Sequence, residues 1–305
     1  MKAKDLFKLV ELRTKSASIL PYLVGTLFAV VYFERFQLIN ALLMLLSLIN
    51  IDLATTTLNH LQEDKSEYST FHLDGTKYSK GAVRRLVFLF LTVGIISGAL
   101  LAWRTGPIVW FTGILSFLFA LTYSTGPLPI YRTPLAEIIS GFFMGFVIIF
   151  LATQIHLGND SFQAYLFAQR LTIELELGHL GALFILSLPL VTAISNVMLA
   201  NNLCDMEADY KIGRYTLPIV IGREQGLILF NVSYILGATA IGLGILLKVL
   251  PLRGILMFLV FIPVFKNARR FSRQPDKIKT FPFVVWNLNL IGLALVATLL
   301  SQLLF

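Results

Sequence analysis

One polar signature occurs twice in a chain that is otherwise strongly apolar. It reads Asn59-x-x-x-Glu63-x-x-x-Glu67 in the first half and Asn201-x-x-x-Asp205-x-x-x-Asp209 in the second. Residues four positions apart lie on the same face of a helix, so each signature would hold an amide and two carboxylates together. Mg²⁺ binds oxygen ligands, characteristically one or two carboxylates together with the phosphate oxygens of a substrate. If the two clusters face each other, they could hold Mg²⁺ ions and, through them, a diphosphate.

The second signature carries further polar residues. Asn202, Asp205 and Asp209 are spaced three and four apart and therefore share a helical face. Lys211 and Arg214 follow directly and could neutralise phosphate charge that a metal does not reach. A segment that only faced solvent would need neither the paired asparagines nor so many acids, so a metal and diphosphate site is the interpretation we favour.

The first signature also extends into the apolar run before it. Asp52, Thr56, Asn59 and Glu63 are spaced four, three and four apart and share one helical face. A carboxylate at the centre of a membrane helix costs about 2.5–3.5 kcal/mol, so Asp52 should point into the bundle or a wet cavity. The alternative is that these acids cap a helix and face solvent.

Composition places these signatures in a membrane protein. Apolar residues make up 56% of the 305 residues and charged residues 14%, against about 25% charged in soluble domains. We expect an all-α polytopic membrane protein with one domain over residues 1–305. Residues 1–15 would form a basic amphipathic segment at the cytoplasmic surface, without the pattern of a cleaved signal peptide. The single cysteine excludes an intramolecular disulfide, and the four histidines lack metal-ligand spacing.

Nine apolar runs predict nine helices, most of them near the bilayer-crossing length of about 20 residues and the eighth shorter. They lie at 17–33, 38–59, 86–103, 107–123, 134–155, 180–201, 226–247, 253–265 and 282–304. Nearly all of the 25 lysines and arginines then fall on the side of the N-terminus; the exceptions are Arg35, Arg104, Arg170, Lys248 and Arg253. The positive-inside rule therefore predicts a cytoplasmic N-terminus, with both acidic signatures on the cytoplasmic face. It also explains the net charge of +8 without nucleic acid.

Three stretches resemble the UbiA superfamily of intramembrane aromatic prenyltransferases, most closely its 1,4-dihydroxy-2-naphthoate branch in menaquinone biosynthesis. They are 59–67, 201–217 and 123–137, the last reading YSTGPLPIYRTPLAE. They resemble the first acidic motif, the second acidic motif and the loop after the fourth helix. One departure is that Glu63 and Glu67 stand where the family usually has aspartates; Asp64 could replace one of them.

The resemblance implies a Mg²⁺-dependent enzyme of the bacterial cell membrane. It would transfer a polyprenyl group from a polyprenyl diphosphate to 1,4-dihydroxy-2-naphthoate, releasing CO₂ and diphosphate and giving demethylmenaquinone. The implied metal ligands are Asn59, Glu63 and Glu67 for one ion, and Asn201, Asn202, Asp205 and Asp209 for the other. Arg132, Lys211 and Arg214 are candidates for the diphosphate, and Asp52 and Tyr123 are catalytic candidates near the aromatic acceptor.

Two alternatives remain open. The acceptor could be another molecule, such as 4-hydroxybenzoate, haem, a chlorophyll precursor or a sugar phosphate. The chain could also be a transporter, but transporters bind near the bilayer midplane, whereas here only Asp52 lies deep in an apolar run.

Overall fold

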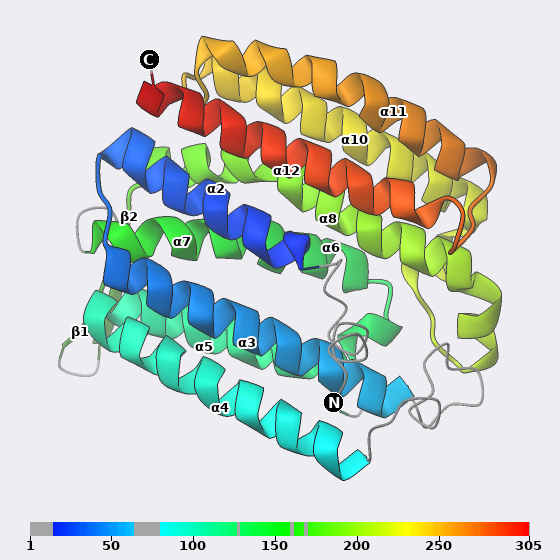
Figure 1. The fold of residues 1–305 in the computed structure, drawn as a ribbon, viewed down its shortest axis with the longest axis horizontal. Helices are drawn as coiled ribbons and strands as arrows, with labels where there is room; N and C mark the ends of the chain where they lie inside the picture. Colours follow the sequence, from blue (N-terminus) through cyan, green and yellow to red (C-terminus); the bar gives the residue numbers. More distant parts are fainter. Residues whose placement is uncertain (1–14, 64–79, 127–128, 159–161, 168–169, 305) are drawn as a thin grey trace.

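The computed structural model describes residues 15–63, 80–126, 129–158, 162–167 and 170–304. In this part of the chain, long helices lie side by side with roughly parallel axes (Figure 1). The elements are α2 (Ser16–Phe33), α3 (Leu38–Glu63), α4 (Lys80–Thr105), α5 (Pro107–Ser124), η3 (Ile130–Arg132), α6 (Ala136–Ser140), η4 (Gly141–Val147), α7 (Ile148–Leu157), β1 (Phe162–Phe167), β2 (Arg170–Leu175), α8 (Leu177–Lys211), α9 (Leu217–Ile221), α10 (Arg223–Leu246), η5 (Leu252–Leu256), α11 (Met257–Arg273) and α12 (Phe281–Leu304).

Eight helical segments in the described residues are long and apolar enough to cross a membrane: α2, α3, α4, α5, the continuous segment from α6 to α7, α8, α10 and α12. The prediction of a polytopic helical membrane protein is confirmed. The count of nine spans is not, because the run predicted at 253–265 divides into the short η5 and the 17-residue α11. Helix α11 packs beside α10 and α12 but ends in basic residues, including Arg270 and Arg273.

A small β-hairpin interrupts the helical pattern between α7 and α8. Strands β1 and β2 pair antiparallel, with Phe162 opposite Leu175 and Phe167 opposite Arg170. Its sequence, FQAYLF followed by RLTIEL, is rich in the aromatic and β-branched residues that favour strands. The prediction contained no strand here, because the stretch was treated as a connection between two spans.

The segment from α6 to α7 contains a π-helical stretch, η4, where it crosses α8. Gly141 and Gly145 lie in η4 and permit this close contact. A Cβ atom on Gly145 would come within 2.7 Å of Cα of Val191, a backbone atom of α8. Single π-helical turns within α-helices often occur at functional sites, and Glu137 lies one turn before this one.

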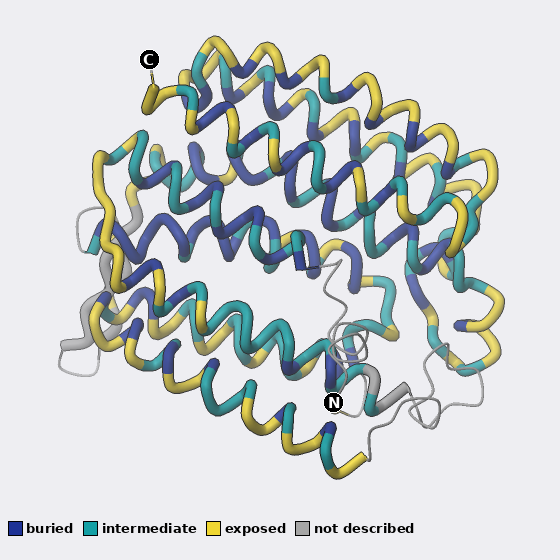
Figure 2. The backbone as a smooth tube through the Cα atoms, viewed as in Figure 1, coloured by how far each residue is buried: buried dark blue, intermediate teal, exposed yellow. Residues whose placement is uncertain are grey.

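Helix α8 is the central element of the bundle. It packs against α10, α12 and η4, and its residues Leu183, Leu190 and Ala193 have no exposed surface. Figure 2 shows buried residues concentrated on the inner helices and exposed residues along the outer helices α4 and α11. Large apolar side chains such as Phe88 of α4 and Ile262 of α11 are exposed there, as expected of a surface that faces lipid.

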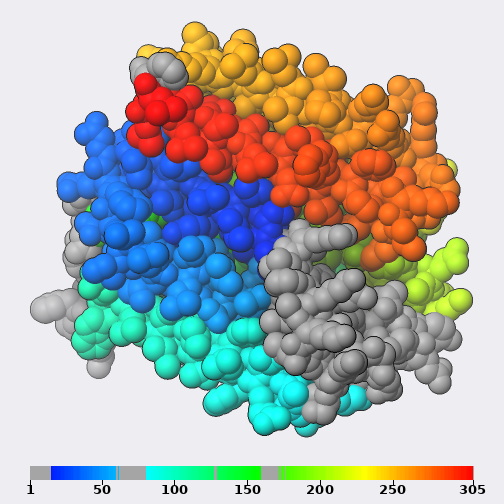
Figure 3. All heavy atoms as spheres, in the orientation of Figure 1, coloured from blue at the N-terminus to red at the C-terminus, as the bar shows by residue number. Residues whose placement is uncertain are grey.

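Polar side chains inside the bundle have internal partners. The Asn196 side chain donates to the carbonyl oxygen of Phe230 at 2.9 Å, and Asn267 donates to Oδ1 of Asn287 at 2.9 Å. Hydrocarbon offers no competing water, so such groups must be satisfied within the protein. In the space-filling view, the side chains of α12, α2 and α3 meet along one continuous face (Figure 3).

The described residues of both acidic signatures lie toward the same end of the bundle. Helix α8 ends at the right of Figure 1, near the turn from α11 to α12, and α3 ends at the lower right. The bundle thus brings together segments that are far apart in the sequence, and this end is where we describe the candidate site.

The close approach of η4 to α8 predicts a steric effect. Gly145→Ala should lower the thermal unfolding midpoint of the protein in detergent, because the added methyl must displace α8 at a cost of about 1–3 kcal/mol. Gly113→Ala in α5 is the matched control, because nothing lies within 4 Å of its Cβ position. An unchanged midpoint for Gly145→Ala would contradict the packing described here.

Candidate active site

The second acidic signature lies entirely on α8. The helix continues to Lys211 instead of ending near 201, so the predicted helical face is formed along the whole signature. Asn202 and Asp209 are 0% and 3% exposed, whereas Asn201 and Asp205 are half-buried. Asn201 Nδ2 donates to Asp205 Oδ2 at 3.3 Å, as expected for neighbours four positions apart.

Arg214 connects this helix end to the segment between α5 and α6. Gly213 has a φ of +67°, which favours glycine, and the turn it forms lets the Arg214 amide donate to the Asp209 carbonyl at 2.9 Å. The Arg214 guanidinium donates to Asp209 Oδ1 and to Asn202 Oδ1, each at 3.2 Å, and to the carbonyl oxygen of Tyr131 at 3.0 Å. It also lies 4.9 Å from the centre of the Tyr131 ring, within cation–π range.

Glu137 completes this buried network from α6. Its carboxylate is 2% exposed, and its Oε1 accepts a hydrogen bond from Asn202 Nδ2 at 2.8 Å. Asn202 therefore bridges Glu137 and Arg214 with both ends of its amide. The sequence predicted Asn202 as a metal ligand, and that assignment stays a prediction; in the structure its amide bonds to Glu137 and Arg214.

Two carboxylate oxygens in the network are buried and have no hydrogen-bond partner among the described residues. They are Oδ2 of Asp209 and Oε2 of Glu137. Burying a charged oxygen without a partner is costly, so such atoms indicate places where a cation or water would bind.

A lysine from a distant part of the sequence contacts Asn201 and Asp205, the other two residues of the signature. Lys277, in the loop between α11 and α12, places its Nζ 2.5 Å from Oδ2 of Asp205 and also donates to Oδ1 of Asn201. These amide and carboxylate oxygens are therefore arranged around a positive charge.

The donor types at the end of α8 fit a magnesium ion. Within the described residues, no group of three or more His, Cys, Asp or Glu side chains is placed to hold a metal. Mg²⁺ does not need such a group, because it usually keeps several waters and uses one or two carboxylates plus substrate phosphates. Asp205, Asp209 and Asn201 offer that combination.

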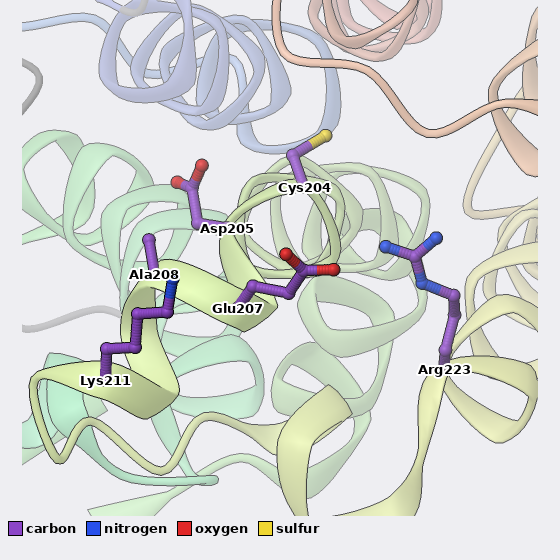
Figure 4. Close-up of a pocket in the computed structure, with 6 residues that line it drawn as sticks. All are labelled: Cys204, Asp205, Glu207, Ala208, Lys211 and Arg223. Carbon is purple, nitrogen blue, oxygen red and sulfur yellow. The ribbon is translucent and has the colours of Figure 1, made fainter.

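A pocket of about 400 Å³ opens beside this helix end and is shown in Figure 4. Its lining residues are Cys204, Asp205, Glu207, Ala208, Lys211 and Arg223. Arg223, at the start of α10, points across the pocket toward Glu207, and Lys211 rises from the end of α8. The pocket thus combines two carboxylates, Asp205 and Glu207, with two cations, Lys211 and Arg223.

The first signature is only partly within the described residues. Asn59 is half-buried on α3, and its Oδ1 is buried without a partner there. Glu63 is the last residue of α3, whereas Asp64 and Glu67 lie outside the described residues. The assignment of Asn59, Glu63 and Glu67 to a metal therefore stays a prediction.

Asp52 belongs to a separate polar cluster on α3. Its Oδ1 pairs with Lys15 Nζ at 2.6 Å, and its Oδ2 accepts from the Ser18 hydroxyl at 2.5 Å. Lys15 is 7% exposed and also donates to Thr56 Oγ1 at 2.6 Å. The expectation that Asp52 points into the bundle is confirmed, and its charge is paired with the ammonium of Lys15.

Tyr123 and Arg132 lie on the Arg214 side of the site. The Tyr123 hydroxyl donates to Sδ of Met198 on α8 at 3.4 Å, and its ring centre is 6.4 Å from that of Tyr131. Arg132 is exposed, and its Nε donates to the Tyr131 hydroxyl at 3.1 Å. Among the described contacts, none joins Tyr123 to Asp52, so the two catalytic candidates lie in different clusters.

Several residues of the site were given no role by sequence reasoning. Glu137 had a usable signal, because a carboxylate inside a predicted span should face the bundle interior. Lys277 had no local signal, because its partners Asp205 and Asn201 are 72 and 76 positions away. Lys15 is likewise 37 positions from Asp52.

Comparison with known proteins agrees with this fold. The chain matches the UbiA prenyltransferase family over residues 18–291. Because the match covers most of the sequence, the chain belongs to the UbiA prenyltransferase family, and it is an integral membrane protein with the eight apolar helices described above. The resemblance drawn from the three sequence stretches is confirmed.

Individual relatives share sequence or fold with this chain. The 1,4-dihydroxy-2-naphthoate octaprenyltransferase of Bacillus subtilis (strain 168) is 26% identical over 236 residues, which are 75% of this chain and 70% of the relative. The apo structure of a UbiA homolog from Aeropyrum pernix K1 has a TM-score of 0.70 at 15% identity, covering 94% of this chain and 98% of that one. A UbiA homolog from Archaeoglobus fulgidus bound to GPP and Mg²⁺ has a TM-score of 0.66 at 18% identity, covering 99% and 100%. At such identities, the two structures show a shared fold.

The Arg214 network predicts that lysine cannot replace this arginine. Arg214→Lys keeps the charge but loses the planar guanidinium, whose three nitrogens donate to Asp209, Asn202 and Tyr131 together. We expect a loss of about 1.5–3 kcal/mol in stability, because buried partners lose a charged hydrogen bond. The thermal midpoint in detergent measures this, with the exposed Arg132→Lys as control; equal midpoints for the two variants would contradict the role of Arg214.

Proposed function

We propose that this protein transfers a polyprenyl group from a polyprenyl diphosphate to 1,4-dihydroxy-2-naphthoate, releasing diphosphate and CO₂ and giving demethylmenaquinol, the reduced form of demethylmenaquinone. The observation that carries the transferase function is the oxygen-rich end of α8, where Oδ2 of Asp209 is buried without a hydrogen-bond partner among the described residues and Asp205 pairs with Lys277. The choice of acceptor is supported by the similarity to the Bacillus subtilis relative.

In this proposal, the end of α8 binds the diphosphate of the donor. Asp205, Asp209 and Asn201 would hold Mg²⁺, which neutralises the charge that develops on the leaving diphosphate. The exposed Lys211 and Arg132 are candidates for direct contact with phosphate oxygens. Arg214 would act mainly through Asp209 and Asn202, because its guanidinium is already engaged with them. Asn59, Glu63 and Glu67 would hold a second ion from α3.

The reaction would break the bond between the allylic carbon and the diphosphate oxygen. Diphosphate leaves with the electron pair, and the electron-rich naphthoate ring supplies the pair for the new carbon–carbon bond. The new bond would form at the ring carbon that bears the carboxylate, and departure of CO₂ would return the electron pair of the carbon–carboxylate bond to the ring and restore aromaticity without loss of a ring proton. Tyr123 is placed beside Tyr131 and the Arg214 network, where its ring could face the developing cation. Asp52, paired with Lys15, would lie near the acceptor from the α3 side.

The side of the membrane on which the site lies is also part of the proposal. We infer that the N-terminus and this end of the bundle face the cytoplasm of a bacterial cell, because nearly all lysines and arginines would then lie inside. A charged head group would arrive from water while the prenyl chain lies in lipid. One transmembrane domain over residues 1–305 would carry the whole function.

The first test is a transfer assay with the purified protein, 1,4-dihydroxy-2-naphthoate and a long polyprenyl diphosphate. We expect product only with Mg²⁺, none with EDTA, and a product mass that lacks the carboxyl group. Mg²⁺-dependent transfer to 4-hydroxybenzoate instead would retain the transferase and reject the naphthoate acceptor. No transfer to any aromatic acceptor would reject the proposed function.

Asp209 provides a test of the metal site. Asp209→Asn keeps an oxygen that can accept from Arg214 but removes the negative charge that Oδ2 would offer a metal. The rate of prenyl transfer should therefore fall by at least about a hundredfold. Glu224→Gln is the control, because Glu224 is exposed and lies outside both the proposed ligand set and the pocket lining. Both variants should insert into the membrane, and Asp209→Asn should also lower the thermal midpoint, because it removes the charged partner of the nearly buried Arg214; full activity of Asp209→Asn would refute the ligand assignment.

A further inference from the structure

The loop between α11 and α12 is held by its own hydrogen bonds. Asp276 Oδ1 accepts from the backbone amides of Ile278 at 2.9 Å and Lys279 at 2.6 Å. The Thr280 hydroxyl accepts from the Asp276 amide at 2.9 Å and donates to the carbonyl of Gln274 at 2.7 Å. The two amide donors hold the pKa of the Asp276 carboxyl below its ordinary value, so the carboxylate stays ionised at neutral pH. The loop therefore keeps its shape without using the side chain of Lys277.

This loop presents Lys277 to the second acidic signature. Its ammonium contacts Asp205 Oδ2 at 2.5 Å and Asn201 Oδ1, and it lies 5.5 Å from the centre of the Phe281 ring. The Lys277 side chain is 39% exposed and that of Asp205 is 26% exposed. The pair is thus open to solvent on one side, unlike the nearly buried pair of Arg214 and Asp209.

The oxygens that Lys277 occupies are the same ones proposed to bind metal. Asp205 Oδ2 already accepts from both Lys277 and Asn201 Nδ2. A metal ion in contact with this oxygen would stand very close to the ammonium, and two positive charges at such a distance repel strongly. The ammonium and the metal therefore compete for one position.

We propose that Lys277 is a tethered cation that occupies the Asn201–Asp205 side of the site when no metal is bound and is displaced when Mg²⁺ enters. This inference rests on the proposed function, because it assumes that these oxygens hold the metal. Before metal binding, the ammonium keeps Asn201 and Asp205 in place and offsets the repulsion between Asp205 and Asp209, which are four positions apart on α8.

The displaced ammonium would remain at the site. Lysine carries a flexible four-carbon stem with three donors, and the loop that bears it is fixed by Asp276 and Thr280. The side chain can therefore swing away from Asp205 while its backbone stays in place. A phosphate oxygen of the donor substrate, bound at the same metal, is the partner that its charge then fits.

Metal affinity tests the competition directly. Titrating the full-length protein in detergent with Mn²⁺, followed by its EPR signal and without substrate, we expect Lys277→Met to bind Mn²⁺ roughly two- to fivefold more tightly, as for a partly exposed ion pair. Lys279→Met is the matched control: it removes the same charge from the same loop, and Lys279 is exposed. Its affinity should stay close to that of the wild type.

A second measurement uses the wild-type protein and does not depend on a variant that folds. Lysine acylation followed by peptide mass spectrometry should label Lys277 slowly without metal and several times faster with Mg²⁺. Labelling of Lys279 should not change with Mg²⁺. Equal labelling of Lys277 with and without bound Mg²⁺ would show that the ammonium is not displaced.

The outcomes separate this inference from the proposed function. If the wild type and both variants bind Mn²⁺ with one affinity, or if the two variants tighten binding equally, Lys277 does not compete and the inference fails, while the metal site stands. If none of the three proteins binds Mn²⁺, the metal site fails, and the inference fails with it.

Discussion

The structure depends on one constraint: a charged group inside a helical membrane bundle must find its partners within the protein. Arg214 meets this constraint by binding Asp209, Asn202 and the Tyr131 carbonyl together. Asn202 also donates a hydrogen bond to Glu137 in α6. The end of α8, the segment after α5 and the start of α6 are thereby held in one arrangement, and the free oxygens of the site are fixed by that arrangement.

The same constraint explains why the site lies on helices. Carboxylates at positions 205 and 209 keep a constant spacing because α8 continues through both of them. Loops contribute cations: Arg214 follows α8, and Lys277 lies between α11 and α12. The anionic oxygens are thus held on a rigid scaffold, whereas Lys277, only partly buried, can exchange its partner. This division suits the proposed binding and release of a diphosphate.

Much of this arrangement could be predicted from local sequence. Long apolar runs predicted the helices of the bundle, and the spacing of the signatures predicted their shared faces. The structure differs from the prediction where contacts between separate segments determine the local conformation. Gly141 and Gly145 allow a π-helical stretch against α8. The hairpin after α7 depends on pairing between β1 and β2. The run at 253–265 divides into the short η5 and α11.

The sequence by itself determined the class of protein, the positions of both acidic signatures and the family, because apolar run length and helical spacing are local properties. Only the tertiary structure decided which charges meet. Lys15 pairs with Asp52, and Lys277 with Asp205, across 37 and 72 positions. Glu137 and Arg214 meet through Asn202 because α6 packs against α8. No local pattern records such pairs, since they follow from how the helices pack and from the need to pair each buried charge.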